Sequence, residues 1–293
     1  MQFPPFAAAL RRLRKAHHGG LQVPAQPYPM VNLVFWRPDT QSHNFGDHLS
    51  KIVVDAILAG KGRVLEEEVP KTRNLLAVGS ILHFANTGDV IWGSGVNGKI
   101  APAAHRFTSL DVRAVRGPLT RDFLQELGIQ VPPVYGDPAL LLPRLFPGRF
   151  RASASKPYVV VPNLHDLRHF AQLPIGTVVS PMDSWNRCVE EILQAELVIA
   201  SSLHGLIIAE AFGIPARYLR VSQTESLFKY RDYVLGTGRT ELVFAKTVDQ
   251  ALEMGGMEHP TFDSQALLDA FPWDLWKGPL AARPGHRQST SAP

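Results

Sequence analysis

The chain has 293 residues, of which 45% are hydrophobic, and this length suits one large or two medium-sized globular domains. Lysine and arginine total 30 against 26 acidic residues, and a net charge of +4 is too small to indicate a nucleic-acid-binding protein. The single cysteine, Cys188, excludes an intrachain disulfide and a cysteine-based metal cage, and it fits the buried face of a helix.

The two ends of the chain differ in composition from the rest. Residues 1–29 carry a basic cluster without an apolar run ahead of a cleavage site, so they do not resemble a secretory signal. We expect a cytoplasmic protein whose basic N-terminal segment is either frayed or in peripheral contact with an anionic bilayer. Nowhere does the sequence contain 18 consecutive apolar residues, as a membrane span requires. Residues 281–293 are polar and predict a disordered tail.

Short apolar runs alternate with amphipathic segments along the chain, which predicts parallel sheets connected by crossover helices. A first helix covers residues 49–57 and ends at Gly60, and a second begins at Pro118 and ends at Gly128. The predicted strands are Val31–Trp36, Leu75–Val78, Val90–Trp92, Val112–Val115, Tyr158–Val161, Thr177–Val179, Leu197–Ala200 and Arg217–Val221.

One stretch interrupts this alternation. Residues 143–157 are rich in proline, glycine, serine and arginine and follow neither the strand period nor the helix period, so they predict a domain linker. We therefore expect an N-terminal α/β domain over residues 30–145 and a C-terminal α/β domain over residues 146–280. A ligand cleft is expected between them.

Polar residues precede the first helix, in the segment Asn44-Phe-Gly-Asp47. One interpretation is a helix cap, in which Asn44 or Asp47 binds first-turn amides. The other is a site loop at the carboxyl end of the first strand. A cap alone does not explain Gly46, although a turn would.

The segment Gly93-Ser-Gly-Val-Asn-Gly98 satisfies the dinucleotide fingerprint G-x-G-x-x-G after a strand. A phosphate-binding helix should follow, but the next residues include Pro102 and lack an amphipathic stripe. A structural turn or a backbone-lined ligand loop is therefore favoured over NAD binding. Because glycine lets a ligand approach the backbone closely, the loop with Ser94 and Gly95 is a candidate wall of the cleft.

Four charged residues lie near predicted element ends. Arg113 and Arg116 precede a helix, and guanidinium groups there suit a phosphate or carboxylate. Since successive side chains of a strand point to opposite faces, both arginines reach one ligand only if the strand ends between them. Arg116, which is nearer the helix, is the favoured ligand-binding residue. Arg113 is alternatively a solvated residue at the end of the strand. Asp137 is either a turn residue before Pro138 or a site carboxylate. Lys229 either reaches a phosphate or belongs to an ordinary helix surface.

The most informative stretch is residues 197–215, in which a buried strand leads directly into a helix. Ser201, Ser202, His204 and Gly205 lie at the junction, where open α/β sheets bind ligands and free helix amides attract anions. The alternative is a serine N-cap with a histidine packed beside it.

Six motifs occur in the order seen in polysaccharide pyruvyl transferases, and over roughly residues 30–240 the chain most resembles the bacterial exopolysaccharide ketal-pyruvyltransferases. They are Asn44–Asp47, Trp92–Gly95, Val115–Pro118, Gly136–Pro138, Ser201–Gly205 and Lys229–Asp232.

This resemblance implies two Rossmann-like domains arranged as in GT-B glycosyltransferases, with the active site in the interdomain cleft. It implies transfer of pyruvate from phosphoenolpyruvate onto two hydroxyls of a hexose in a lipid-linked exopolysaccharide repeat unit, with release of phosphate. Phosphoenolpyruvate is the co-substrate, and neither a cofactor nor a metal is implied. The inner membrane is then the bilayer that the protein would contact.

Carried over to this sequence, Arg116 and His204 match the positions expected at the phosphoenolpyruvate site. Several relatives have arginine where this chain has Ser202, so another cation, such as Lys229 or Arg113, would replace it. His204 is the expected general acid, and Asp47 or Asp137 the base. Further donor contacts are expected from Ser201, Ser202 and Gly205, and acceptor or cleft-loop contacts from Asn44, Gly46, Ser94 and Gly95.

Two other functions stay open at this stage. The first is a GT-B glycosyltransferase that uses a nucleotide-sugar, since a shared fold does not determine the reaction. The second is a non-catalytic sugar-binding subunit. Ser202, in the place of an arginine of several relatives, is compatible with a loss of catalysis. Phosphate release from phosphoenolpyruvate distinguishes the pyruvyltransferase from both.

Overall fold

The structure is a computed structural model that describes residues 31–38, 44–65, 73–223 and 225–276. Residues 30–273 form one compact unit. The predicted basic segment 1–29 and the predicted tail 281–293 lie outside the described residues.

Four parallel strands form the first sheet, in the order β1-β2-β3-β4. Val115, directly after β4, adds a parallel bridge to Tyr135. The paired residues Leu75 and Val90 are fully buried, as expected for a parallel sheet covered on both faces. The strands are Val31–Val34 (β1), Arg73–Leu76 (β2), Val90–Trp92 (β3) and Asp111–Ala114 (β4).

The second sheet repeats this arrangement, with four parallel strands in the order β5-β6-β7-β8. Val160 and Ile199 are paired and fully buried at its centre. The strands are Lys156–Val161 (β5), Ala195–Ala200 (β6), Ala216–Leu219 (β7) and Phe244–Ala245 (β8).

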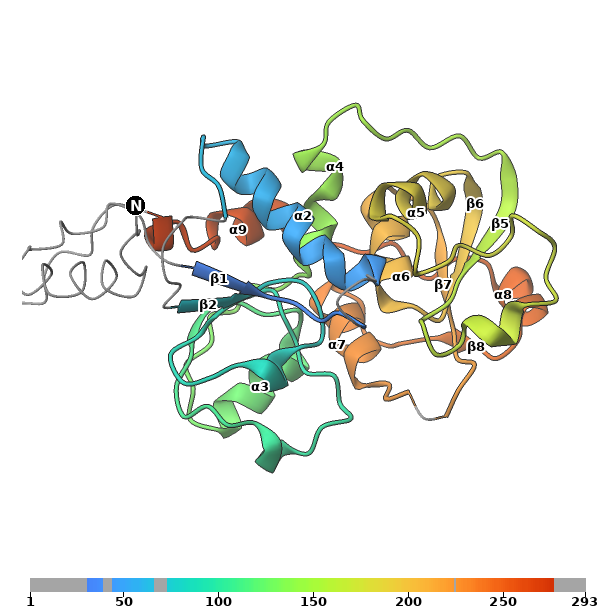
Figure 1. Cartoon of the computed structure of the whole chain (residues 1–293). Coiled ribbons are helices and arrows are strands. Elements are labelled where there is room, and N and C mark those ends of the chain that lie inside the picture. The colour runs from blue at the N-terminus through green and yellow to red at the C-terminus, as the bar shows by residue number, and fades with distance from the viewer. Residues whose placement is uncertain (1–30, 39–43, 66–72, 224, 277–293) are drawn as a thin grey trace, which may run out of the picture. The chain divides into compact units, whose positions relative to one another are not determined.

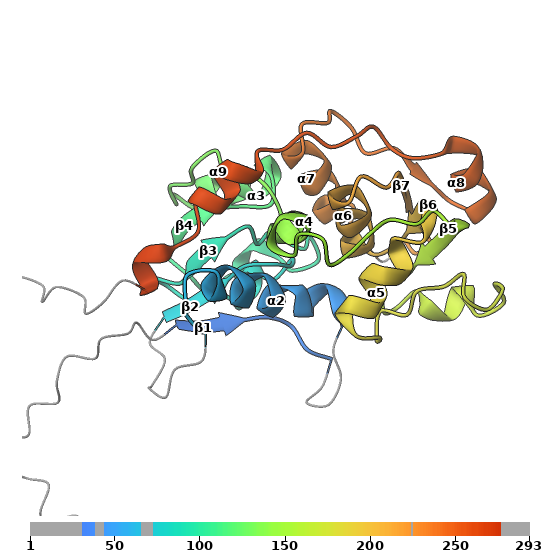
Figure 2. The ribbon, with the colours of Figure 1, turned by 90° about the horizontal axis from the view of Figure 1, so that it is seen from above.

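Helices connect the strands, and Figures 1 and 2 show α2, α4, α6 and α7 between the two sheets. The α-helices are Phe45–Ala59 (α2), Pro118–Glu126 (α3), Leu142–Leu145 (α4), Trp185–Ile192 (α5), Leu203–Ala211 (α6), Phe228–Gly236 (α7), Val248–Met254 (α8) and Ser264–Asp269 (α9). Short 3₁₀ turns cover Leu82–Phe84 (η1), Pro102–Ala104 (η2), Pro138–Leu141 (η3), Leu167–Phe170 (η4) and Trp273–Trp276 (η5).

Two of these helices position the candidate site. The side chain of Asn44 caps α2 by accepting a hydrogen bond from the Gly46 N–H at 3.2 Å, and a stripe that includes Leu49 and Val53 is fully buried. The side chain of Ser202 caps α6 by accepting from the Gly205 N–H at 3.3 Å. Almost all of α6 is buried, which is typical of a helix enclosed by packed elements.

The C-terminal part of the chain returns to the first sheet. The indole N–H of Trp92, in β3, donates to the Leu267 carbonyl in α9 at 2.8 Å, and the Trp92 ring meets Phe271 edge-on. Between α3 and α7, the backbones approach so closely that a side chain on Gly117 would collide with the Asp232 carbonyl. Segments from the C-terminal half of the described chain therefore pack around the first sheet.

The sheets confirm the predicted α/β class and are consistent with two Rossmann-like domains, whereas the GT-B arrangement, the interdomain cleft and the domain boundaries stay predictions.

The predicted strand Thr177–Val179 is wrong, because only Val178 bridges Val160 there. Residues 143–145 of the predicted linker belong to the short helix α4. Cys188 is buried in α5, and burial raises its thiol pKa to about 12, as suits a structural cysteine. Every helix in the described part of the chain is too short or too polar to cross a bilayer.

Candidate active site

A cavity of about 250 Å³ is lined by residues from three of the six motifs singled out in the sequence. Its lining residues come from segments that follow strands of both sheets, which is where parallel α/β sheets bind ligands. They include Asn44 and Asp47 after β1, Ser80 after β2, Asn97 and Lys99 after β3, Asn163 after β5, Ser202 and His204 after β6, and Glu225 and Lys229 after β7.

His204 and Asp137 form a buried pair at this cavity. His204 Nε2 lies 3.8 Å from Asp137 Oδ2, and both atoms are buried without a hydrogen-bond partner. The other oxygen, Asp137 Oδ1, accepts from the Ala139 N–H at 3.0 Å and caps η3. The two atoms thus face each other slightly beyond hydrogen-bonding distance, and a small approach would join them.

Burial shifts the pKa of each group toward its neutral form. Burial, followed by the positive charges of Lys229 and Arg116, lowers the pKa of His204 to about 3. Burial also raises the pKa of Asp137 to about 6, although the Ala139 N–H and Arg116 oppose the rise. At pH 7 the imidazole is therefore neutral, and the carboxyl group lies close to its titration range.

The first turn of α2 packs directly on the His204 ring. A side chain on Gly46 would bring its Cβ to 2.2 Å from His204 Nδ1, so only glycine fits. The next residue, Asp47, lines the cavity. Burial raises the pKa of its carboxyl group to about 7; the positive charge of Lys229 lowers this pKa, and the negative charge of Asp137 raises it further. Asp47 therefore has the titration range of a general base for reactions near neutral pH.

Two lysines share one carboxylate at another side of the cavity. Lys229 Nζ lies 2.8 Å from Glu225 Oε2, and Lys99 Nζ pairs with Glu225 Oε1. Burial alone would raise the pKa of Glu225, but the two lysines outweigh it and the pKa is lowered. Burial in turn lowers the pKa of Lys229. One acid and two bases leave a net positive charge, which favours anions.

Arg116 is fully buried and lies outside the cavity lining. Its guanidinium contacts Asp232 at 3.0 Å and the Val96 carbonyl at 2.6 Å. Its Nη1 also donates to Ser80 Oγ at 2.6 Å, and Ser80 does line the cavity. Arg116 therefore supports the site through Ser80 and through its charge.

The strand-to-helix junction combines capping with site formation. Ser201 Oγ accepts from the Asn163 N–H at 3.1 Å, and Ser202 caps α6 while lining the cavity. A side chain on Gly205 would collide with Val161 in β5, so this glycine lets α6 pack on the sheet. The structural and functional interpretations of the junction are therefore compatible.

Three other expected site residues hold the surrounding loops. Ser94 is buried and donates to the Gly79 carbonyl at 3.0 Å, and a side chain on Gly95 would collide with the Arg116 guanidinium. Arg113 pairs with Asp111 at 2.6 Å and is absent from the cavity lining. Lys229, in contrast to Arg113, lines the cavity.

Sequence reasoning did not single out Lys99 and Glu225. Glu225 precedes Lys229 by four residues, which is the spacing of a helical ion pair, and Lys99 directly follows the glycine-rich loop. A polar residue directly after a predicted strand is a second sequence signal for a site residue, and Asn163, which follows β5, lines the cavity. Within the described residues, no group of three His, Cys, Asp or Glu side chains is placed to hold a metal ion.

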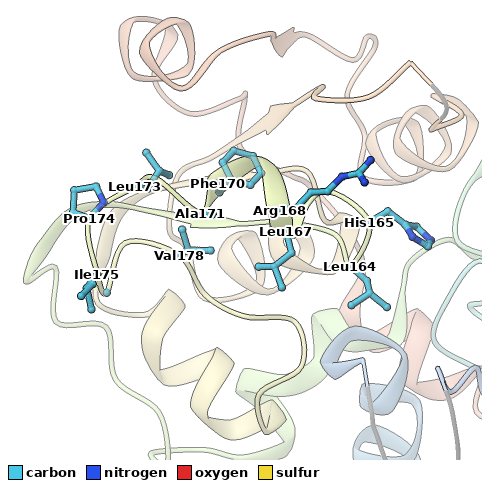
Figure 3. Close-up of a pocket in the computed structure, with 11 residues that line it drawn as sticks. Leu164, His165, Leu167, Arg168, Phe170, Ala171, Leu173, Pro174, Ile175 and Val178 are labelled. Atoms are coloured by element: carbon cyan, nitrogen blue, oxygen red, sulfur yellow. The ribbon is translucent and has the colours of Figure 1, made fainter.

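An apolar cavity of about 740 Å³ adjoins the candidate active site. The two cavities share Leu164 and His165. Figure 3 shows these two residues at one end of the apolar cavity, with Pro174 and Ile175 at the other. The Ile175 side chain is fully exposed, although it is apolar.

Comparisons with known proteins connect this site to a family. The alignment with the succinoglycan biosynthesis protein ExoV of Rhizobium meliloti is 27% identical over 220 residues, covering 70% of this chain and 65% of that protein. An uncharacterised protein of Acanthamoeba polyphaga mimivirus is 24% identical over 243 residues, covering 78% of this chain and 84% of that protein. A functionally uncharacterised Klebsiella pneumoniae protein of known structure is 13% identical, with a TM-score of 0.45 over 84% of this chain and all of that one.

The sequence model of polysaccharide pyruvyl transferases matches residues 44–223, a range that contains Asp47, Asp137 and His204. This match covers more than half of the chain and most segments that line the cavity. The chain therefore belongs to the polysaccharide pyruvyl transferase family.

Proposed function

We propose that this protein transfers pyruvate from phosphoenolpyruvate onto two hydroxyls of a hexose during exopolysaccharide synthesis, forming a cyclic ketal and releasing phosphate. The observation that carries the proposal is that His204, paired with the buried Asp137, lines the same cavity as Asp47 and Lys229. This set offers an acid with an orienting carboxylate, a base and a cation. Family membership and the similarity to a succinoglycan biosynthesis protein support the same reaction.

The donor is a small anion with a phosphate and a carboxylate. Lys229 and Lys99 are the cations of the cavity that can bind it, and the unpaired amides at the N-terminus of α6 add donors. Lys229 then takes the role of the arginine that Ser202 replaces. Binding requires that the donor compete with Glu225 for the two lysines.

His204 delivers the proton that starts the reaction. In the free protein its imidazole is neutral, partly because Lys229 and Arg116 disfavour a second positive charge. A bound phosphate offsets these charges and raises the pKa of His204, so the imidazolium forms when the donor is present. Protonation of C3 of the enol then leaves an oxocarbenium-like centre at C2. Asp137 stabilises the charged ring and holds its orientation.

Asp47 is the proposed base. One hexose hydroxyl adds to C2 and gives up its proton, and the bond from C2 to the phosphate oxygen breaks. The second hydroxyl then adds to C2, loses its proton and closes the ring. The sum is phosphoenolpyruvate plus diol giving ketal plus phosphate. A carboxyl pKa of about 7 lets Asp47 accept a proton and release it near neutral pH.

A lipid-linked acceptor is part of the proposal. The apolar cavity that meets the active-site cavity at Leu164 and His165 is a suitable place for an apolar group attached to the saccharide (Figure 3). Such an acceptor would bring the reaction to the cytoplasmic face of the inner membrane, with peripheral contact.

Two measurements test this function. Phosphoenolpyruvate should raise the melting temperature of the protein, whereas NAD and UDP-glucose should not, because ligands that bind only the native state stabilise it by mass action. Phosphate release should then require both phosphoenolpyruvate and a hexoside from a panel of glucosides, galactosides and mannosides, and His204→Ala should abolish it. Stabilisation by UDP-glucose with donor-dependent release of UDP would instead establish a glycosyltransferase.

A further inference from the structure

A second polar cavity, of about 680 Å³, lies on the other side of the Lys99–Glu225 ion pair. Lys99 and Glu225 line both this cavity and the active-site cavity. The wall also contains Arg220 and Arg231. This arrangement places a basic compartment next to the reacting groups.

The charge of this wall is unbalanced. Glu225 is the only acidic residue among the described residues that line the cavity, and it already pairs with Lys99 and Lys229. In the part of the chain that the structure describes, neither Arg220 nor Arg231 forms an ion pair. The cavity therefore offers two guanidinium groups without a counter-charge.

Arg220 is held in place although its guanidinium is not satisfied. It follows β7 directly, and its backbone N–H donates to the Ala245 carbonyl at 2.9 Å. The guanidinium carbon lies 5.6 Å from the centre of the Phe244 ring, and Nε is buried without a hydrogen-bond partner. A buried donor on a charged group is costly when unpaired, so its position at the carboxyl end of a parallel strand points to a ligand.

We propose that Arg220 and Arg231, with Lys99 at the shared wall, bind a phosphoryl group carried by the acceptor. This inference rests on the proposed function, because it concerns the acceptor of that reaction. Guanidinium groups bind phosphoryl oxygens in bidentate geometry, and two of them suit a dianion. The volume exceeds what one phosphate needs, so a phosphorylated saccharide fits, and the shared wall directs its sugar toward His204.

The test is calorimetric titration of the full-length protein, saturated with phosphoenolpyruvate, with pyrophosphate, glucose 1-phosphate or inorganic phosphate. We expect pyrophosphate and glucose 1-phosphate to bind more tightly than inorganic phosphate. Arg220→Gln and Arg231→Gln should each weaken this binding about tenfold, the scale of one charged hydrogen bond. Arg231 is exposed, so its substitution leaves the fold intact. Arg151→Gln, at an exposed arginine outside both cavities, is the matched control and should bind normally.

Three results would overturn the inference. Unchanged affinity in both variants would show that these arginines do not form the site. Competition between pyrophosphate and phosphoenolpyruvate would place the anion in the active-site cavity. Inorganic phosphate binding as tightly as glucose 1-phosphate would identify a free-phosphate site. The proposed function fails separately, through the absence of phosphate release from phosphoenolpyruvate in the unmodified protein.

Discussion

Replacing Asp137 by asparagine should lower activity and raise stability at the same time. The asparagine Oδ1 can keep the bond from the Ala139 N–H, so η3 remains capped. Its amide would face His204 Nε2 at the position now taken by Oδ2, and as a donor it would select the tautomer with the proton on Nδ1. Turnover should fall by about 10²–10⁴-fold, the scale for loss of positioned acid catalysis.

The effect on stability follows from the pKa of Asp137, which burial raises from 3.8 to about 6. One pKa unit corresponds to about 1.4 kcal/mol, so keeping this carboxylate ionised costs the folded protein about 3 kcal/mol. Between these two pKa values the native state binds more protons than the unfolded state, and stability decreases as the pH rises. The gain from Asp137→Asn should therefore be greatest above pH 6 and vanish below the unfolded pKa.

Urea unfolding at pH 4 and pH 8, together with phosphate-release assays, measures both effects. Asp232→Asn is the matched control, because Asp232 is equally buried but pairs with Arg116 and accepts from Thr120. This control should lose about 3–5 kcal/mol of stability, since it breaks a buried ion pair. An Asp137→Asn variant with normal turnover and no pH-dependent gain in stability would refute the reasoning.

Four further predictions concern residues around the cavity. His204→Gln should remain folded and bind phosphoenolpyruvate, with turnover reduced by about 10²–10⁴-fold; near-normal turnover at saturating donor would make His204 a structural residue only. At saturating phosphoenolpyruvate, where His204 already carries its proton, the kcat/KM for the hexoside should rise with pH near 7, because Asp47 must lose its proton to act as a base, and Asp47→Asn should remove that step from the pH profile. Lys229→Ala should raise the KM for phosphoenolpyruvate by about tenfold or more and change kcat less, and an unaltered KM would exclude Lys229 from donor binding. Gly46→Ala should reduce turnover although alanine favours helices, because its Cβ would displace the His204 ring; circular dichroism would verify that the variant is folded.

Local sequence patterns predicted much of the fold. Asn44 and Ser202 begin α2 and α6 as expected of capping residues, and the apolar runs at β3 and β6 lie in the sheets. Short elements escaped prediction because few residues carry their signal, as in the two-residue strand β8. The return of α9 to Trp92 depends on partners 175 residues apart, which no local pattern records.

For the candidate site, position after a strand was the useful signal. Asn44, Asp47, His204 and Lys229 were all singled out by their positions after predicted strands, and all four line one cavity. Arg116 was harder to place, because its carboxylate partner Asp232 is 116 residues away in sequence, and burial between them cannot be seen locally. The requirement for glycine at position 46 likewise arises from a ring on α6.

The most direct test of the account follows the hydrogen that enters the donor. The reaction is run in deuterium oxide with phosphoenolpyruvate and a hexoside acceptor, and the product is examined by NMR and mass spectrometry. If His204 protonates C3 of the enol, the product is a cyclic ketal whose methyl group carries one solvent deuteron, and His204→Ala does not form it. A ketal without deuterium in its methyl group, or a normal yield of labelled product from His204→Ala, would contradict the account.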